Sequence, residues 1–265
     1  MSDTTTVSQN VAVIGLGSMG YGIAKSALRG GHSVWGVDIN PDQMARFASE
    51  GGQAGSLIDV ADRLDTVIVA VLNAAQTETA LFGDQGIASG LRKGAAVLAC
   101  ATVPPAFAKD MAARCASLGV LYLDAPISGG SVKAAQGKLS IMASGTPEAF
   151  AAVQPVLNSV SETVFALGDE AGAGSAMKAV NQLLAGVHIA VMAEAMTFGM
   201  TQGVRPDKFV EIISKCAGTS WMLEITTAAM QQFAAAAEMG LGGEDDAAVA
   251  KVYARNAGLK LPGEI

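Results

Sequence analysis

From residue 10 to about residue 167 the chain alternates short runs of apolar, β-branched residues with stretches of helical periodicity. The first five runs are almost continuously apolar, as expected for strands that are buried on both faces of a sheet. The expected strands are residues 11–14, 34–38, 66–70, 95–99, 120–123, 139–143 and 163–166. A helix is expected between the last two strands, beginning at Pro147, because proline is favoured at the first helical position. The alternation predicts an α/β fold with a Rossmann-type doubly wound sheet.

The pattern changes after Gly168, where the strand signals stop. No proline occurs in residues 172–203, and apolar residues recur there near the helical spacing, which predicts one long helix. Further helices are expected at residues 206–216, 220–237 and 245–256. We therefore expect two domains, an α/β domain over residues 1–167 and an all-α C-terminal domain over residues 168–265.

Composition and charge limit the classes of partner. Apolar residues make up 51% of the 265 residues and charged residues 15%, which is typical of a globular chain with its own core. The formal charge is −7, from 17 basic and 24 acidic residues, so nucleic acid and anionic membrane surfaces would be repelled. A small metabolite is therefore the expected partner.

Signals for targeting, membrane insertion and metal binding are weak. The first ten residues are polar and lack the basic region and apolar stretch of a signal peptide. The apolar stretch from Leu183 to Ala193 is shorter than the ~20 residues that span a bilayer. The three cysteines have no CxxC spacing and the chain has only two histidines, so we expect no metal site and a location in the reducing cytoplasm.

A glycine-rich motif follows the first expected strand. Residues 15–20, GLGSMG, have the spacing G-x-G-x-x-G between a strand and a helix. The first glycine permits the tight turn, the second lets the backbone approach a pyrophosphate, and the third lets the helix pack closely on the strand. The N–H groups and the dipole at the start of that helix favour phosphate. This context favours a dinucleotide site over a chance cluster of glycines.

Asp38 ends the second expected strand and lies 18 residues after Gly20. This is near the ~20 residues at which an acidic residue meets the adenosine ribose in dinucleotide-binding folds. A carboxylate there accepts from both ribose hydroxyls and repels a 2′-phosphate, so NAD is favoured over NADP. A methyltransferase could use a similar loop and acid, and this half of the chain alone leaves that class open.

The segment DAPISGG, residues 124–130, follows the fifth expected strand. It therefore lies at the carboxyl edge of the sheet, where open α/β sheets bind their ligands. The hydroxyl of Ser128 and the bare backbone of Gly129 and Gly130 could offer donors to a carboxylate. A plain turn is the alternative interpretation of these three residues.

Lys178 lies in the first turns of the long expected helix, and Gln182 is expected on the same face because it is four residues further on. The apolar neighbours Met177, Val180 and Leu183 favour partial burial, which would lower the pKa of the amine. A lysine of this kind can take a hydroxyl proton while hydride leaves the same carbon. The alternative is a solvated surface lysine.

The glycine motif, the DAPISGG segment and the glycine-rich approach to Lys178 together resemble the β-hydroxyacid dehydrogenase family. That family includes 3-hydroxyisobutyrate dehydrogenase, tartronate semialdehyde reductase and 6-phosphogluconate dehydrogenase. The three motifs occur in the family's order, and the resemblance covers nearly the whole chain. It implies an NAD-binding Rossmann domain, a helical domain for substrate binding and assembly into dimers or tetramers, and NAD-dependent oxidation of a small hydroxy acid.

The resemblance also assigns roles to individual residues of this sequence. NAD would be held by Gly15, Leu16, Gly17, Ser18, Met19, Gly20 and Asp38, with Leu72, Asn73 and Thr102 bordering it. The substrate would be held by Ser128, Gly129, Gly130, Asn181 and Gln182. Lys178 would be the general acid/base.

Within the family, the segments around Lys178, Glu194 and Trp221 are most similar to members that oxidise a four-carbon sugar acid, L-threonate. Gln182 stands where the generic family has asparagine, and its longer amide would suit a differently placed hydroxyl. The alternatives that the resemblance leaves open are 3-hydroxyisobutyrate and tartronate semialdehyde (2-hydroxy-3-oxopropionate).

The chain departs from the family after Met230, where it passes directly to Gln231 and lacks the helical stretch with a Lys-Asp-Leu motif. In the family the lysine of that motif reaches cofactor and substrate. An incomplete wall of the active site is therefore expected. This makes a catalytically impaired NAD-binding scaffold the alternative to an active enzyme.

Overall fold

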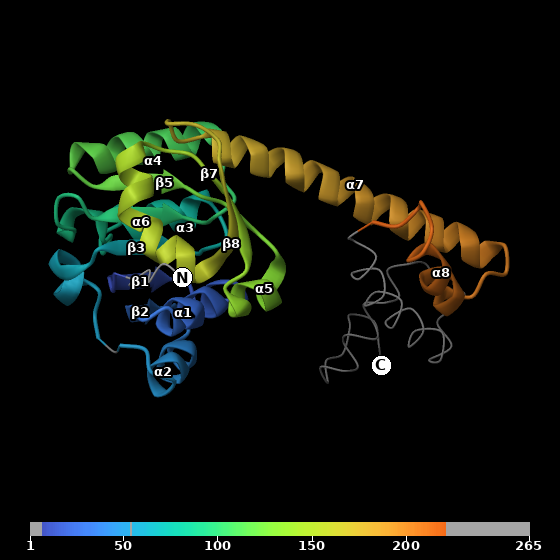
Figure 1. Ribbon diagram of the computed structural model, residues 1–265, viewed down its shortest axis with the longest axis horizontal. Helices are drawn as coiled ribbons and strands as arrows, with labels where there is room; N and C mark the ends of the chain where they lie inside the picture. Colours follow the sequence, from blue (N-terminus) through green and yellow to red (C-terminus); the bar gives the residue numbers. More distant parts are fainter. Residues whose placement is uncertain (1–6, 54, 221–265) are drawn as a thin grey trace, which may run out of the picture. The chain divides into compact units, whose positions relative to one another are not determined.

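The computed structural model describes residues 7–53 and 55–220. They belong to two compact units, the first ending at Val180 and the second beginning at Asn181 (Figure 1). The helices expected at residues 220–237 and 245–256 lie outside the described residues, apart from Ser220. The departure from the family after Met230 also lies outside them.

Five parallel strands form the main sheet of the first unit (Figure 1). They are β1 (Asn10–Ile14), β2 (Ser33–Val37), β3 (Thr66–Val69), β4 (Ala96–Ala99) and β5 (Leu121–Asp124), in the order β2-β1-β3-β4-β5. Each end lies within one residue of the expected strand, so the first five strand predictions are confirmed. Because all four pairings are parallel, the carboxyl ends of these strands gather at one edge.

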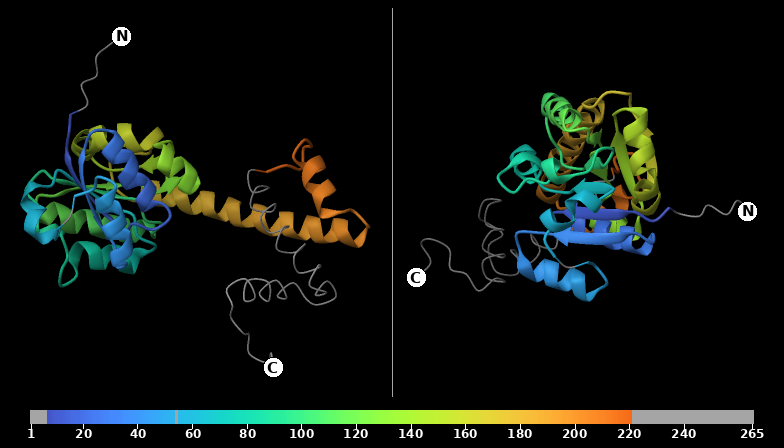
Figure 2. Two further views of the ribbon diagram at one scale, coloured as in Figure 1. Left: turned by 90° about the horizontal axis from the view of Figure 1, so that it is seen from below. Right: turned by 90° about the vertical axis from the view of Figure 1, so that its left-hand side faces the viewer.

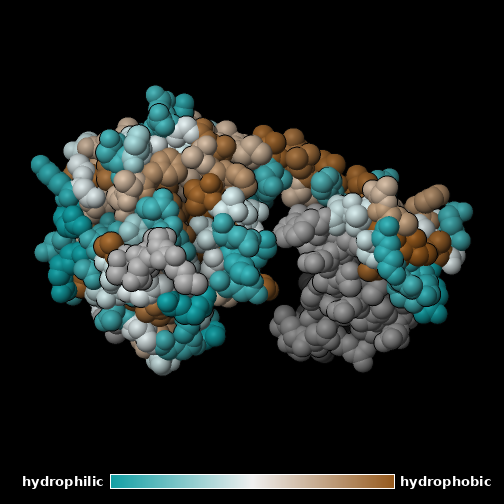
Figure 3. Space-filling model, viewed as in Figure 1, coloured by the Kyte–Doolittle hydropathy of each residue, from teal (hydrophilic) through white to brown (hydrophobic). Residues whose placement is uncertain are grey.

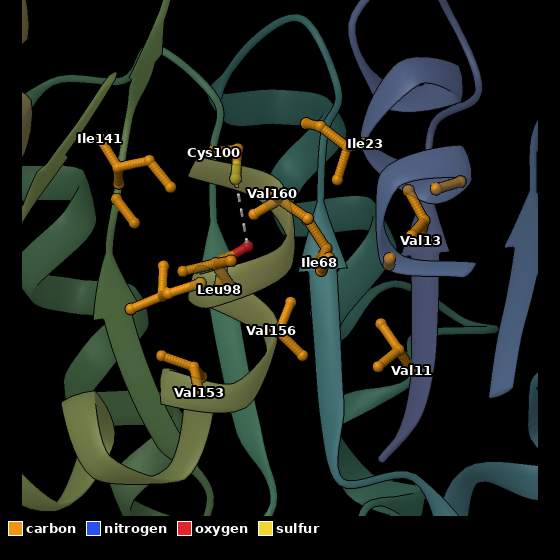
Figure 4. Packing of buried hydrophobic residues seen from close by; sticks show 14 of the residues in the cluster. Val11, Val13, Ile23, Ile68, Leu98, Cys100, Ile141, Val153, Val156 and Val160 are labelled. Carbon is orange, nitrogen blue, oxygen red and sulfur yellow. Dashed lines mark hydrogen bonds between the residues drawn. The ribbon is translucent and has the colours of Figure 1, made fainter. Parts of the chain in front are cut away.

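Helices cover both faces of this sheet, as predicted (Figure 2). The pleat sends Val11 and Val13 to one face and Ala12 to the other. On the first face lie α1 (Gly20–Arg29) and α6 (Pro147–Val160), and Figure 4 shows valines of α6 packed over strand residues. On the second face lie α3 (Ala74–Phe82), α4 (Pro105–Ser117) and the 3-10 turns Ile58–Arg63 and Ala88–Gly90. Helix α2 (Pro41–Ser49) follows β2 and buries Phe47.

A second, three-stranded sheet has the order β6-β7-β8. Its strands are β6 (Ile127–Ser128), β7 (Leu139–Ala143) and β8 (Ser161–Ala166), with α5 (Gly130–Gln136) between β6 and β7. The sequence predicted β7 and β8 but not β6, because two residues are too few to show a period. A backbone bridge between Asp124 and Ser144 connects the two sheets.

The long helix α7 (Ala173–Thr201) confirms the prediction for residues 172–203, and α8 (Pro206–Ile213) ends before the expected residue 216. The apolar stretch from Leu183 to Ala193 lies within α7 and is followed there by Glu194. The whole helix α7, with its alanines and glycines, is long enough to cross a membrane. Its mean hydropathy of 1.6 over the most apolar window is also high enough. Core helices of soluble proteins can share both properties.

His32 is buried between the start of β1 and helix α6. Its Nδ1 accepts a hydrogen bond from the backbone N–H of Gln9 (3.2 Å), so the other nitrogen, Nε2, can donate to the carbonyl of Pro155 (3.3 Å). Only the neutral ring satisfies both contacts, because a proton on Nδ1 would face the N–H of Gln9. Burial lowers the pKa of His32 below its ordinary value of 6.5.

We expect His32 to make the first unit less stable in acid. The unfolded chain takes up a proton at the ordinary histidine pKa before the folded one does, so stability is full above about pH 6.5 and falls as the pH drops below it. The free energy of unfolding of His32→Gln should therefore depend less on pH between about 7.5 and 5. His188→Gln, at an exposed position, is the control. Parallel curves for wild type and His32→Gln would contradict this assignment.

Candidate functional site

The three glycines between β1 and α1 have three different surroundings. Gly15 has a φ of +96°, and a Cβ there would lie 2.7 Å from the carbonyl oxygen of Ala70. A Cβ on Gly20 would lie 1.8 Å from the carbonyl oxygen of Gly15. By contrast, a Cβ on Gly17 would have nothing within 4 Å. The first and third glycines are therefore required by the turn and by helix packing, while open space in front of Gly17 leaves its backbone accessible to a phosphate.

The other residues of the loop differ in what they expose. The side chain of Leu16 is buried in the core, so only its backbone lies in the loop. Ser18 is exposed and Met19 is half-buried against the core. Gly17 and Ser18 thus form the accessible part of the loop at the start of α1.

Asp38 directly follows β2 and turns its carboxylate toward the glycine loop. Its Oδ2 accepts from the N–H of Leu16 (2.6 Å), and its Oδ1 accepts from the N–H of Asn40 (2.8 Å). A carboxylate has further lone pairs, so each oxygen can still accept a ribose hydroxyl. Ile39, beside it, is fully exposed and was not singled out from the sequence. The loop and Asp38 therefore fit a dinucleotide whose ribose carries no 2′-phosphate.

Leu72 and Asn73 follow the third strand of the main sheet, and Thr102 follows the fourth. All three are exposed at the edge where the carboxyl ends of the strands lie. The side-chain oxygen of Asn73 accepts from the N–H of Gln76 (2.9 Å) and caps α3. The structure thus gives Asn73 a local role at a helix start.

The segment from Ser128 to Gly130 is a strand end followed by a helix start. Ser128 pairs with Ser140 in β6 and β7, and it is half-buried. Gly129 and Gly130 have φ values of +131° and +75°, and no side chain caps α5. Gly130 has open space where a Cβ would be. Backbone N–H groups are therefore accessible here, which a carboxylate ligand would need.

Lys178 is buried in the second turn of α7, although its neighbours Met177 and Val180 are about half exposed. Its amine makes no hydrogen bond or ion pair within residues 7–53 and 55–220. Burial lowers the pKa of Lys178 below its usual 10.5. The expected partial burial is therefore confirmed, and the catalytic role stays a prediction.

Asn181 and Gln182 continue α7 beyond Lys178 in the second unit. Asn181 is half-buried, while Gln182 is exposed and its Oε1 accepts from Nδ2 of Asn181 (3.3 Å). The sequence placed Lys178 and Gln182 on one face, but Gln182 does not share the burial of Lys178. Asn181, three residues after the lysine, is less exposed than Gln182, four residues after it, and so lies nearer to the buried side of the helix.

The sequence analysis missed a buried polar cluster beside the start of α7. Oδ2 of Asp124 accepts from the N–H groups of Gly172 and Ser175 (2.9 Å each) and from the hydroxyl of Ser144 (3.3 Å). Oδ1 accepts from the hydroxyl of Ser175 (2.7 Å), and the hydroxyl oxygen of Ser144 accepts from the N–H of Gly174 (2.9 Å). The signal available was an acid at the end of a strand, but its partners lie far away in the sequence.

Two family models match the chain in consecutive segments. The NAD-binding domain of 6-phosphogluconate dehydrogenase matches residues 10–168. The NAD-binding domain of NADP-dependent 3-hydroxyisobutyrate dehydrogenase matches residues 172–226. The first match covers the main sheet, the glycine loop and Asp38, and the second covers Lys178.

Similar proteins extend over nearly the whole chain. L-threonate dehydrogenase of Cupriavidus necator is 41% identical, over 97% of this chain and 99% of that protein. L-threonate dehydrogenase of Escherichia coli K12 is 37% identical, over 96% and 97%. The crystal structure of 3-hydroxyisobutyrate dehydrogenase from Salmonella typhimurium has a TM-score of 0.79 at 38% identity, over 96% of this chain and 90% of that one.

The first of these alignments has 298 positions against 265 residues here, so part of that relative has no counterpart in this chain. The family models, the relatives and the fold nevertheless agree. The chain has the NAD-binding domains of hydroxyacid dehydrogenases and is an oxidoreductase. It belongs to the β-hydroxyacid dehydrogenase family.

Proposed function

We propose that the chain is an NAD-dependent dehydrogenase that oxidises L-threonate or a related four-carbon sugar acid. The observation that carries the dehydrogenase assignment is the buried Lys178, which has no ion pair in the described part and lies in the same compact unit as the glycine loop. The substrate rests on the L-threonate dehydrogenases that are 37–41% identical over nearly their full length.

The residues of the first unit fit NAD as the cofactor. The pyrophosphate would lie against Gly17 and the start of α1, where the backbone is open. The ribose hydroxyls would donate to Asp38, and Leu72, Asn73 and Thr102 would border the nicotinamide end. Bound NAD supplies a hydride acceptor. The negative charge of Asp38 disfavours the additional phosphate of NADP.

The substrate carboxylate would be bound by Ser128, Gly129 and Gly130. Gly130 is open to the surroundings and the start of α5 has no side-chain cap, so its backbone can donate to an anion. Asn181 and Gln182 would bind hydroxyl groups of the acid. The side chain of Gln182 is longer than the asparagine of the generic family, which suits an acid that carries hydroxyl groups on several carbons.

Lys178 would act as the general acid/base. In oxidation, its neutral Nζ accepts the proton of the substrate hydroxyl while the two electrons of the C–H bond leave with hydrogen as hydride. A carbonyl group forms on that carbon, and the lysine is left as an ammonium that releases its proton to water. The lowered pKa favours the neutral amine that this step requires.

The proposal includes four further assignments: a second candidate substrate, the domain boundary, the location and the assembly. The 3-hydroxyisobutyrate dehydrogenase structure at 38% identity makes that acid the second candidate substrate, with tartronate semialdehyde beside it. The domains would divide near residue 168, and the chain would act in the cytoplasm. Figure 3 shows apolar surface along α7. Leu183, Leu184 and Phe198 of this helix are exposed, which supports assembly into a dimer or tetramer.

The proposed activity is tested by measuring NAD reduction at about 340 nm, the absorption of the reduced nicotinamide, with three- and four-carbon hydroxy acids. We expect the highest kcat/KM for L-threonate and lower values for 3-hydroxyisobutyrate and glycerate. Turnover of 3-hydroxyisobutyrate above L-threonate would replace the substrate assignment. NAD binding without reduction by any acid would favour the scaffold.

Replacing Asp38 should change cofactor choice. Asp38→Ala removes the acceptor for the ribose hydroxyls, and the lost charged hydrogen bonds are worth about 1.5–3 kcal/mol. We expect weaker NAD binding and a smaller preference for NAD over NADP when both are titrated. Asp42→Ala, which removes the same charge from an exposed position four residues away, is the matched control. An unchanged preference in Asp38→Ala would remove this residue from the site.

Replacing Lys178 should affect the chemical step and leave cofactor binding intact. We expect Lys178→Ala to lower kcat by ~10²–10⁴. Lys178→Met keeps the apolar stem in its buried place and should be equally impaired, while Lys138→Ala, at an exposed position, should behave as wild type. Single-turnover measurements at saturating NAD separate the two steps. Equal turnover by wild type and Lys178→Met would exclude the acid/base role.

A further inference from the structure

The backbone and the side chain of Asp124 hold different parts of the first unit. Its N–H donates to the carbonyl of Ser144 (3.0 Å), and its carbonyl accepts from the N–H of Ser144 (2.8 Å), which connects β5 to the segment after β7. Its carboxylate accepts from three groups around the start of α7, in Gly172 and Ser175. One residue thus fixes the two sheets and the first turn of α7 together.

The first turn of α7 lies unusually close to the sheets. A Cβ on Gly174 would lie 2.4 Å from the carbonyl oxygen of Met142 and 2.8 Å from that of Asp124. On the other side, a Cβ on Gly172 would lie 2.9 Å from Cε of Lys109 in α4. Bare backbone at both glycines therefore lets α7 begin between β5, β7 and α4. Asp124 and Lys109 are the charged groups that these contacts bring to the start of the helix.

The burial pattern shows that Lys178 lies on the same side of α7 as this cluster. Gly174, Ser175 and Lys178 are buried, whereas the residues between Ser175 and Lys178 and the two after Lys178 are exposed. Residues three apart on a helix share a face. Lys178 therefore lies one turn after Ser175, whose hydroxyl donates to Asp124, and on the same face. Any shift or unwinding of the first turn would therefore move Lys178.

The carboxylate of Asp124 suits this place better than an amide would. It accepts from backbone donors at the positive end of α7, and a negative charge there is favoured by the helix dipole. An asparagine would replace one carboxylate oxygen with an NH₂ group, which donates and cannot accept. If that group faced the N–H groups of Gly172 and Ser175, these buried donors would lack a partner. The start of α7 would have to move or open to hydrate them.

We propose that Asp124, acting through Ser175 and Ser144, is a positioning residue that fixes where α7 begins and thereby holds the amine of Lys178 in its buried place. This inference rests on the acid/base role proposed for Lys178, because positioning affects catalysis only if that amine takes part. Asp124 itself contacts neither substrate nor cofactor in this assignment. It acts on the reaction only through the lysine.

The test compares Asp124→Asn and Ser175→Ala with Thr66→Val. Thr66 is a buried residue at the amino end of β3 whose hydroxyl donates to Gln9 (2.9 Å), so its variant loses a partly buried hydrogen bond at the opposite edge of the sheet. Asp124→Asn should lower kcat by about 10- to 100-fold, as small misplacements of a catalytic group do, with little change in KM for NAD. Ser175→Ala loses only the hydrogen bond from the Ser175 hydroxyl to Asp124 and should lower kcat less. It also serves as the test variant if Asp124→Asn does not fold.

The pH profile separates positioning from general loss of structure. If the amine moves toward water, the pKa of Lys178 rises toward its usual value, and the pH at which kcat/KM for oxidation increases moves upward. Thr66→Val should leave this pH unchanged. The same pKa can be measured without turnover, by reductive methylation with ¹³C-formaldehyde and NMR titration of the lysine signal that is absent from Lys178→Met.

Three outcomes decide the matter. A raised pKa of Lys178 in Asp124→Asn or Ser175→Ala, with lower kcat and an unchanged Thr66→Val, supports the proposal. An unchanged Lys178 pKa in every one of these two variants that folds overturns it, even if turnover falls. A raised Lys178 pKa in a protein whose wild type reduces no NAD supports the positioning and rejects the proposed function.

Discussion

The carboxylate of Asp124 is buried at the end of the last strand of the main sheet, and a buried charge is costly unless donors surround it. The chain provides those donors from segments that lie 20 to 51 residues away in the sequence. Leaving one such N–H without a partner costs about 1–3 kcal/mol, so the strand end, Ser144 and the start of α7 specify one another. The place of Lys178 follows from this arrangement, since it lies one turn further along the same face.

The cofactor half of the site depends on a different and more local constraint. At Gly15 and Gly20 the backbone is packed so closely that a Cβ would clash with a carbonyl oxygen, and Asp38 binds the loop through the N–H of Leu16. The loop is thus held in shape from both sides before any ligand arrives, while Gly17 stays open. If Asp38 and Lys178 have the roles proposed for them, substitutions at these two residues should therefore alter cofactor binding and proton transfer independently.

Much of this arrangement could be predicted from the sequence. The five main strands, the helix at Pro147 and the long helix α7 follow from continuous apolar runs and helical periodicity, and the glycine spacing predicted the loop. Strand β6 was missed because two residues are too few to show the alternation of apolar and polar positions. The Asp124 cluster was missed because its bonds join residues with no local pattern between them. The sequence predicted that Lys178 and Gln182 share one face of the helix. In the structure Gln182 is exposed, and Asn181, three residues after the lysine, is half-buried instead.

The most direct test of the central constraint is amide hydrogen exchange in the unmodified protein, because it reports the backbone bonds at the start of α7 without any substitution. The account predicts that the N–H groups of Gly172, Gly174 and Ser175 exchange as slowly as those of β4 in the centre of the sheet. Exchange of these three amides at the rate of exposed loop amides, while β4 remains protected, would contradict it.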